Sequence, residues 1–315
     1  METDLLGAPY EKLTLEFPPD AEGPVVATLV RRRADTPARR AVLYLHGFVD
    51  YFFQTHLADF FATRGWDFYA LDLRKHGRSL LPHQTPNHCR SLTDYYPEVD
   101  AAARIVMSDD GHDRLLLLGH STGGLLSVLW SHDRAADRPV DGILLNSPFF
   151  DFQAPWLVRR PVLGAVAGVG RAAPLQRVVA GLPRHYGESL HTSLRGRWDY
   201  NLAWKPVAGF PVRAGWLAAI RTGQRRVRTG LALDVPVLVT TSDRSYLGTR
   251  WDEAVRRSDA VLNIAHMARW APQLGRHVTL VRIAGGVHDL TLSDPAVQDR
   301  VFDEWDRWLS AYQRP

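Results

Sequence analysis

The strongest chemical signal in the sequence is a serine set among small residues, in the segment Gly119-His120-Ser121-Thr122-Gly123-Gly124. This segment follows the apolar run 114–119 and precedes apolar residues at helical spacing over 125–130. A G-x-S-x-G pattern between a strand and a helix is typical of a tight turn that lifts a serine hydroxyl above the sheet edge. The five-residue match alone also fits a structural turn, but its position after the most apolar strand favours Ser121 as a nucleophile.

A serine nucleophile requires an imidazole base, and the base requires a carboxylate that orients it. We expect His288 to be the base, because it alone of the 13 histidines follows the last core strand, in the glycine-containing loop 284–288. Two aspartates compete for the third role, since Asp243 directly follows the apolar run 235–241 and Asp259 opens the segment leading to the last strand.

The spacing to His288 separates the two aspartates. Asp259 precedes His288 by 29 residues and Asp243 precedes it by 45. One helix, one strand and two short connections take up about 30 residues. The spacing therefore favours Asp259 as the acid, with Asp243 as the alternative.

An ester or amide substrate would also need N–H donors for the oxyanion that forms during the reaction. One donor is expected from Thr122, the residue after the nucleophile. The second is expected from the loop after the run 40–47, where the small Gly47 lets the backbone amide of Phe48 face the pocket. We therefore expect Phe48 and Thr122 to form the oxyanion hole.

The elements that would position these residues are short apolar runs separated by helix-length amphipathic segments such as 95–107. Runs of this kind are typical of strands buried on both faces. Two β-rich stretches, 13–17 and 25–33, come first. The apolar runs follow at 40–47, 67–72, 114–119, 142–146, 235–241 and 278–283. This alternation predicts an α/β fold with a mostly parallel sheet and helices on both faces.

The alternation stops at residues 148–232, about 85 residues without a clear core strand. This is too long for a bare loop in a compact domain, and it contains Trp156, Trp198, Trp204 and Trp216. We expect a helical cap over 148–232, inserted into a core formed by 1–147 and 233–315. The cap could be a lid that controls substrate entry or an extra packing layer.

Charge is unevenly distributed along the chain. Residues 151–230 contain 12 Arg and one Lys against two Asp and one Glu, a net charge of +10, although the whole chain carries only +4. Such a segment could admit an anionic substrate or rest weakly on an acidic membrane surface, or the arginines could serve solubility alone. The basic residues are scattered and no nucleic-acid motif accompanies them, so no nucleic-acid partner is expected.

The remaining composition favours a cytoplasmic protein. The single cysteine, Cys89, has no internal disulfide partner, and the segment 1–6 carries Glu2 and Asp4 where a secretion signal would be basic. No apolar stretch approaches the 18 or more residues of a membrane span. The chain has no H-E-x-x-H motif, and neither a metal nor an organic cofactor is expected.

The chain resembles the α/β-hydrolase superfamily from about residue 25 to 312, and within it the serine aminopeptidase-like group that includes monoacylglycerol lipases and lysophospholipases. The resemblance lies in HGFVD at 46–50, LDLRKHGRS at 71–79, GHSTGG at 119–124 and GGVHD at 285–289. It implies an eight-stranded sheet, a cap after the sixth strand, and a triad of Ser121, Asp259 and His288. The long stretch between Asp243 and Asp259 departs from the family's usual pattern.

These observations predict a serine hydrolase that cleaves a carboxylic ester of a small acyl substrate through an acyl-enzyme intermediate. Thioester, amide or peptide cleavage would use the same residues, and the fold cannot choose among them. A ligand-binding protein that retains the fold without turnover is the alternative from another class. The sequence predicts neither the acyl chain length nor the oligomeric state.

Overall fold

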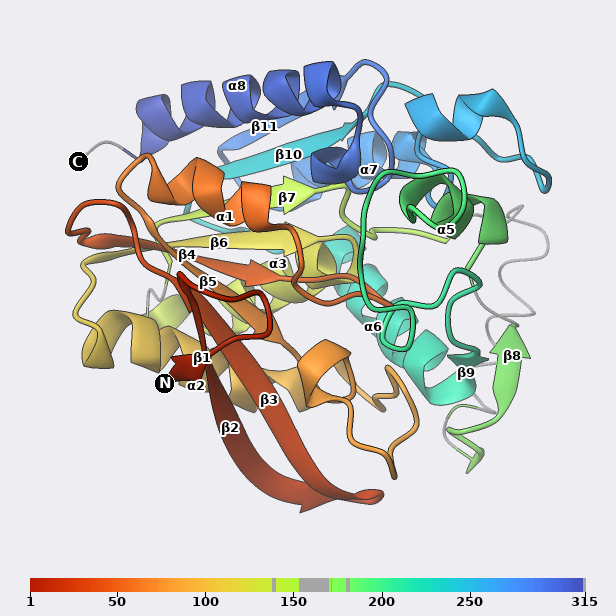
Figure 1. The fold of residues 1–315 in the computed structure, drawn as a ribbon, viewed down its shortest axis with the longest axis horizontal. Helices are drawn as coiled ribbons and strands as arrows, with labels where there is room; N and C mark the ends of the chain where they lie inside the picture. The colour runs from red at the N-terminus through yellow and green to blue at the C-terminus, as the bar shows by residue number, and fades with distance from the viewer. Residues whose placement is uncertain (138–139, 153–169, 171, 180–181, 314–315) are drawn as a thin grey trace.

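A computed structural model describes residues 1–137, 140–152, 170, 172–179 and 182–313 (Figure 1). Over these residues the main sheet has nine strands. Their order across the sheet is β1 (Glu2–Thr3), β2 (Tyr10–Asp20), β3 (Gly23–Arg32), β5 (Asp67–Asp72), β4 (Arg40–Leu45), β6 (Arg114–His120), β7 (Gly142–Asn146), β10 (Val237–Ser242) and β11 (Val278–Ile283).

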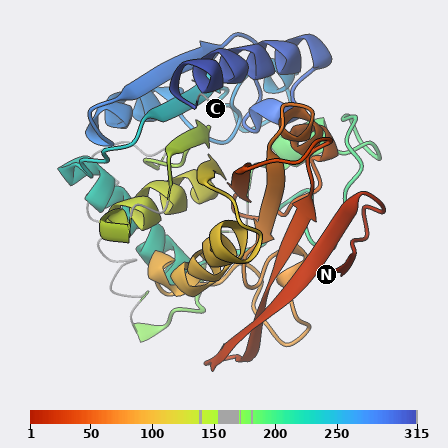
Figure 2. The same cartoon turned by 90° about the vertical axis from the view of Figure 1, so that its left-hand side faces the viewer.

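The pairing of the strands confirms the predicted α/β class with a mostly parallel sheet. All five pairings among β4, β5, β6, β7, β10 and β11 are parallel, whereas the pairings of β1, β2 and β3 are antiparallel. The β2–β3 hairpin extends away from the parallel strands (Figures 1 and 2). The described sheet has one strand more than the eight expected, because two exposed residues, Glu2 and Thr3, pair with the start of β2.

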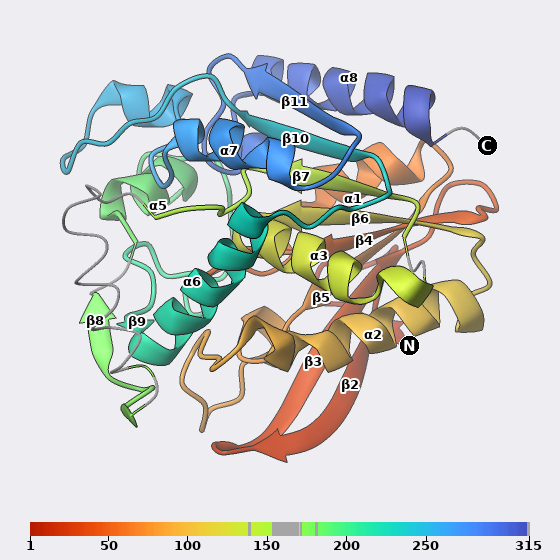
Figure 3. The same cartoon turned by 180° about the vertical axis from the view of Figure 1, so that it is seen from behind.

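Alternate residues of the central strands bury against opposite helical layers. In β6, Leu115 and Leu117 belong to one core cluster and Leu116 and Leu118 to the other. The first cluster includes residues of α2 (Tyr96–Arg104), α3 (Thr122–Asp133), α6 (Ala214–Thr229) and α7 (Ile264–Trp270). The second includes residues of α1 (Thr55–Ala62) and α8 (Pro295–Tyr312). Figures 1 and 3 show these layers from the two sides of the sheet.

Between β7 and β10 the chain leaves the sheet. The elements described there are β8 (Arg177–Val179), α5 (Arg184–Leu190), β9 (Val212–Arg213) and α6. The strands β8 and β9 pair with each other in a two-stranded sheet of their own. Strands of at most three residues carry no clear hydrophobic pattern, so this sheet was not predicted from the sequence. Trp156, predicted to lie in this insertion, is outside the described residues.

Parallel strands bring the loops at their carboxyl ends to one edge of the sheet. Four such loops carry the predicted site residues: those after β4, β6, β10 and β11. The insertion elements α5, β8 and β9 lie beyond the same edge in Figures 1 and 3. The sheet topology therefore gathers the candidate residues beneath part of the insertion.

Candidate active site

Ser121 occupies a strained turn between β6 and α3. Its backbone has φ 52° and ψ −114°, a conformation that L-residues rarely adopt and that costs about 1–3 kcal/mol. A methyl group at Gly123 would lie 2.1 Å from the carbonyl oxygen of Leu45 on β4. The small residue at position 123 is therefore required for the helix to start this close to the sheet.

The Ser121 hydroxyl is the first member of a buried hydrogen-bonded chain. Ser121 Oγ lies 3.0 Å from His288 Nε2, and His288 Nδ1 lies 2.9 Å from Asp259 Oδ2. An ionised carboxylate only accepts hydrogen bonds, so the proton of the neutral imidazole is on Nδ1. Nε2 is then free to accept the proton of Ser121.

Asp259 is held in place by backbone groups on both sides. Its Oδ1 accepts the N–H groups of Val261 at 2.9 Å and Leu262 at 2.7 Å, which leaves Oδ2 for His288. Its own backbone bonds to Arg244 and Tyr246, just after the end of β10. The residues between 246 and 259 thus form an excursion that returns to the strand end, and this accounts for the unusual spacing seen in the sequence.

Asp243, the alternative acid, has different partners. Its carboxylate binds the Arg244 guanidinium at 2.9 Å and accepts the backbone N–H of Gly285 at 3.1 Å. Burial alone would raise the pKa of Asp243, but the hydrogen bonds from Arg244 and Gly285 lower it below its usual value. Asp243 therefore braces the loop that carries His288 instead of contacting the imidazole.

The loop after β4 packs directly against the serine. A methyl group at Gly47 would lie 3.1 Å from Ser121 Cβ and 3.2 Å from His120 Cδ2. Phe48 and Thr122, the two expected oxyanion donors, both line the cavity above Ser121. Val49, the next residue, has φ 52°, so this turn is strained as well.

The cavity above Ser121 has a volume of about 380 Å³ and reaches both Ser121 and His288. Apolar side chains form most of its wall, among them Phe149, Val212, Trp216, Leu217, Val261 and Leu262. The Phe48 ring packs on the Trp216 ring with centroids 4.1 Å apart. A concave, mostly apolar pocket with a few convergent polar groups is the usual form of a small-molecule site.

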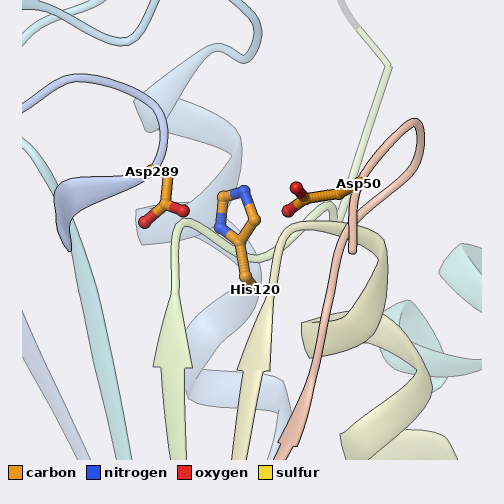
Figure 4. A group of neighbouring side chains, drawn as sticks. All are labelled: Asp50, His120 and Asp289. Carbon is orange, nitrogen blue, oxygen red and sulfur yellow. The ribbon is translucent and has the colours of Figure 1, made fainter. Parts of the chain in front are cut away.

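A second polar group, absent from the sequence prediction, lies beside the serine turn. Figure 4 shows His120 between Asp50 and Asp289, all three buried. His120 Nδ1 donates to the backbone carbonyl of Asn146 at 3.1 Å. Burial lowers the pKa of His120 below its usual value.

Asp289 anchors the loop that carries His288. Its Oδ1 accepts hydrogen bonds from Asn146 and Thr291, and its Oδ2 accepts one from Gln54 at 3.1 Å. Burial alone would raise the pKa of Asp289, but His120, the hydrogen bond from Thr291, Lys205 and Asn146 bring it down to about 2. The carboxylate is therefore ionised at any physiological pH.

The ligand atoms of Asp50, His120 and Asp289 lie within 4.8 Å of one another, a spacing that could hold a metal ion. Their bonding does not fit this role. Both oxygens of Asp289 already accept hydrogen bonds, and the Lys205 ammonium binds Asp50 Oδ1 at 2.5 Å. A cation is thus already supplied by the chain, and the hydrogen bonds of the three residues run to neighbouring groups such as Asn146, Gln54 and Lys205.

The sequence contained a partial signal for this group. Asp50 ends the segment HGFVD, and Asp289 ends GGVHD, so an acid closes each of two loops that the sequence analysis singled out. Nothing local identifies Lys205, the partner of Asp50, which lies 155 residues further along the chain.

The family model described as "Hydrolase_4: Serine aminopeptidase, S33" matches residues 36–295. The chain belongs to this family. The predicted resemblance to the serine aminopeptidase-like α/β-hydrolases is thereby confirmed.

Individual relatives of this S33-family chain share about a third of its residues or fewer over the matched segments. It is 28% identical over 221 residues to a monoacylglycerol lipase of Mycolicibacterium smegmatis, covering 68% of this chain and 72% of the relative. It is 29% identical over 151 residues to the phospholipase YtpA of Bacillus subtilis, covering 48% and 55%. A match to the uncharacterized protein YnbC of Escherichia coli, 34% identical, spans 34% of this chain and 18% of that protein.

Solved structures share the fold across nearly the whole chain. A soluble variant of the monoglyceride lipase of Saccharomyces cerevisiae superposes with a TM-score of 0.70 at 15% identity, covering 95% of this chain and 94% of that one. The monoacylglycerol lipase of Paleococcus ferrophilus gives 0.68 at 18% identity, covering 90% and 99%. These structures show the shared fold, and the S33 family match with the monoacylglycerol lipase relative makes the chain a lipase- or esterase-like α/β-hydrolase. None of its described helices is long and apolar enough to cross a membrane.

Proposed function

We propose that this protein is a serine hydrolase that cleaves carboxylic esters with a lipid-like acyl group through an acyl-enzyme intermediate. The observation that carries the proposal is the hydrogen-bonded chain from Ser121 through His288 to Asp259, placed at the wall of an apolar cavity. A nucleophile within hydrogen-bonding distance of a base, which a third group orients, is the recurring arrangement of covalent acyl transfer.

In the acylation step, His288 Nε2 takes the proton of Ser121 as Oγ attacks the ester carbonyl carbon. The carbonyl oxygen becomes an oxyanion, which the backbone N–H groups of Phe48 and Thr122 stabilise. His288 then gives the proton to the departing alkoxide, so that the alcohol leaves and the acyl group stays on Ser121. Asp259 stabilises the imidazolium that exists between the two transfers.

Deacylation repeats the sequence with water as the nucleophile. His288 removes a proton from a water molecule that attacks the acyl carbon, and the same proton is returned to Ser121 Oγ as the carboxylic acid leaves. The residues of this chain supply every proton transfer and every charge stabilisation in this scheme. It requires no metal or organic cofactor.

The cavity and the relatives support the proposed substrate class. The mostly apolar wall above Ser121 suits an acyl chain. Relatives named as a monoacylglycerol lipase and a phospholipase support a lipid ester over a peptide or amide. Thioester and amide cleavage by the same residues is the second choice.

We also propose that residues 148–232 are a cap on a core of 1–147 and 233–315. Tyr186, Leu190 and Trp216, which belong to this segment, line the cavity together with Ser121. A cap in this position would control access to the serine. A cytoplasmic location and the absence of a nucleic-acid partner stay predictions.

Hydrolysis of p-nitrophenyl acyl esters of graded chain length tests the proposal, with matched anilides and acyl-thioesters measured alongside and Ser121→Ala as the blank. We expect ester turnover with a chain-length optimum, and slower turnover of the anilides. A wild-type protein that binds the esters without cleaving any of the three series would instead favour the ligand-binding alternative.

A further inference from the structure

Lys205 is a buried cation in the segment between α5 and β9, and the proposed mechanism does not use it. The side chain is largely buried, as lysines rarely are unless they are paired. Its Nζ binds Asp50 Oδ1 at 2.5 Å, and both residues line the cavity above Ser121. The ammonium also lies near the rings of Phe53 and Tyr200, 5.5 and 5.7 Å from their centroids.

The partner of Lys205 belongs to the turn that carries Phe48. Asp50 follows Val49, whose φ of 52° is rare for a β-branched residue. A backbone in such a conformation persists only where its surroundings fix it. The buried ion pair at the next residue is one such constraint.

The next residue along the turn is tied to the same part of the insertion. Tyr51 Oη accepts the backbone N–H of Asn201 at 2.7 Å, and the Tyr51 ring meets the Trp204 ring edge-on with centroids 5.2 Å apart. Two consecutive residues, Asp50 and Tyr51, are thus bonded to the segment 201–205 of the insertion.

From these contacts we infer that Lys205 is a positioning residue, through which the insertion holds the turn at 46–51 so that the Phe48 amide can serve the oxyanion. The insertion then does more than cover the cavity. The ion pair between Lys205 and Asp50 holds the turn in the conformation that completes the oxyanion hole. The inference rests on the proposed function, since it assigns Phe48 the donor role given there.

The chemistry of Lys205 favours this role over direct catalysis. Its charge is matched by Asp50, and the contact is a charge-assisted hydrogen bond, which is shorter and stronger than a neutral one. Removing one partner of a buried pair leaves the other charge uncompensated, which disturbs the local structure. Here that local structure is the turn at 46–51, which carries the Phe48 amide.

The test compares three variants: Lys205→Met, Lys205→Arg, and a double variant that carries both Asp50→Asn and Lys205→Met. The double variant removes both buried charges. Arg226→Met is the matched control, because Arg226 also joins the insertion to the core, through Asp133 at the far end of α3. For each variant the kcat and KM of a p-nitrophenyl ester are measured. The affinity for an alkyl trifluoromethyl ketone is compared with that for the matched alkyl alcohol. The serine Oγ adds to the ketone carbonyl carbon, and the carbonyl oxygen becomes an oxyanion.

We expect Lys205→Met and the double variant to lower kcat by about 10- to 100-fold, less than the loss of a whole oxyanion donor, with KM changed less than about threefold. The trifluoromethyl ketone should lose affinity by a similar factor, whereas the alcohol should bind as it does to the wild type, because only the ketone adduct uses the oxyanion hole. Lys205→Arg should recover most of the kcat, and Arg226→Met should keep it.

Two results would overturn the inference while leaving the proposed function intact. One is that the wild type hydrolyses the ester and the folded double variant has the same kcat as the wild type. The other is an equal loss of affinity for ketone and alcohol, which indicates general damage to the cavity. A wild type that neither cleaves the ester nor binds the ketone would instead overturn the proposed function, and the inference with it.

Discussion

Asp259 Oδ2 lies 2.9 Å from His288 Nδ1, although Asp259 is 17 residues beyond the end of β10 at Ser242. The chain makes this possible by leaving the strand end and returning to it, with Asp259 bonded through its backbone to Arg244 and Tyr246. The Asp259 carboxylate therefore lies beside the end of β10, although Asp243 is much nearer to that strand in the sequence. This geometry separates the roles of two aspartates that the sequence left in competition.

The first prediction compares these two aspartates. Asp259→Asn should lower kcat by about 10⁴-fold, because an amide in this position favours the wrong imidazole tautomer and does not stabilise the imidazolium. Asp243→Asn should lower it by less than about tenfold, since Asp243 binds Arg244 and Gly285. Steady-state kinetics with one ester measures both, and a larger loss in Asp243→Asn would contradict the assignment.

The second prediction concerns pH and Asp289. The pKa of Asp289 is lowered to about 2 in the folded protein, against about 3.9 in an unfolded chain. A depressed carboxyl pKa contributes stability that is fully present above about pH 5 and is lost as the pH falls towards 2, amounting to about 2–3 kcal/mol. Asp289→Asn should therefore reduce the free energy of unfolding at pH 7, and the difference from the wild type should shrink below pH 4.

Urea unfolding at pH 7, 4 and 3 measures this difference. Asp303→Asn on the exposed face of α8 is the control, and it should leave the unfolding free energy nearly unchanged at each pH. A difference between Asp289→Asn and the wild type that stays constant across the three pH values would show that the carboxylate charge is not the cause.

The third prediction concerns Gly123. An added methyl group would lie 2.1 Å from the carbonyl oxygen of Leu45 and 2.4 Å from that of His46, and both are backbone atoms with little room to move. Gly123→Ala should therefore destabilise the protein by about 3 kcal/mol, the upper end of the usual cost of overpacking. At Gly111 a methyl group meets no atom within 4 Å and only the φ of 75° opposes it, so Gly111→Ala should cost about 1–2 kcal/mol. Equal losses in denaturant unfolding would contradict the packing argument.

The fourth prediction concerns the basic insertion. Several of its cations bind acids, as in Lys205 with Asp50, Arg226 with Asp133 and Arg228 with Asp151. Paired charges attract an anionic substrate weakly, so matched neutral and anionic esters should show similar kcat/KM at low and high salt. If the anionic ester is favoured at low salt and the preference fades above about 0.1 M, where exposed charges are screened beyond about 10 Å, the insertion would be a site for anions.

The sequence predicted the central strands well because burial on both faces leaves a continuous apolar run. The runs at 67–72 and 142–146 coincide with β5 and β7, whose residues are all buried. The run at 278–283 coincides with β11, which lies at the edge of the sheet and is only partly buried, so there the apolar pattern predicted the strand but not its surroundings. The strand Glu2–Thr3 was not predicted, since two exposed residues are too few to show a hydrophobic pattern. The same holds for β8 and β9, whose pairing depends on tertiary structure rather than on hydrophobic period.

The site shows the same division. Ser121 and His288 could be located because each stands in a glycine-containing turn directly after a predicted strand, and the structure places Ser121 Oγ 3.0 Å from His288 Nε2. The excursion that returns Asp259 to β10 depends on backbone pairing, so the sequence offered only a spacing argument. Lys205 could not be identified from the sequence, because its proposed role depends on a contact with Asp50 that forms only in the folded protein.

The central claim is that Ser121 carries the acyl group, and mass spectrometry of the covalent adduct tests it most directly. The wild type is treated with a fluorophosphonate or a slowly hydrolysed ester, digested, and its modified peptide mapped, with Ser121→Ala treated in parallel. Because the Ser121 hydroxyl lies 3.0 Å from His288 Nε2 at the cavity wall, we expect one adduct, on Ser121, and none in a folded Ser121→Ala protein. An adduct on another serine, or an unlabelled wild type that still hydrolyses esters, would contradict the account.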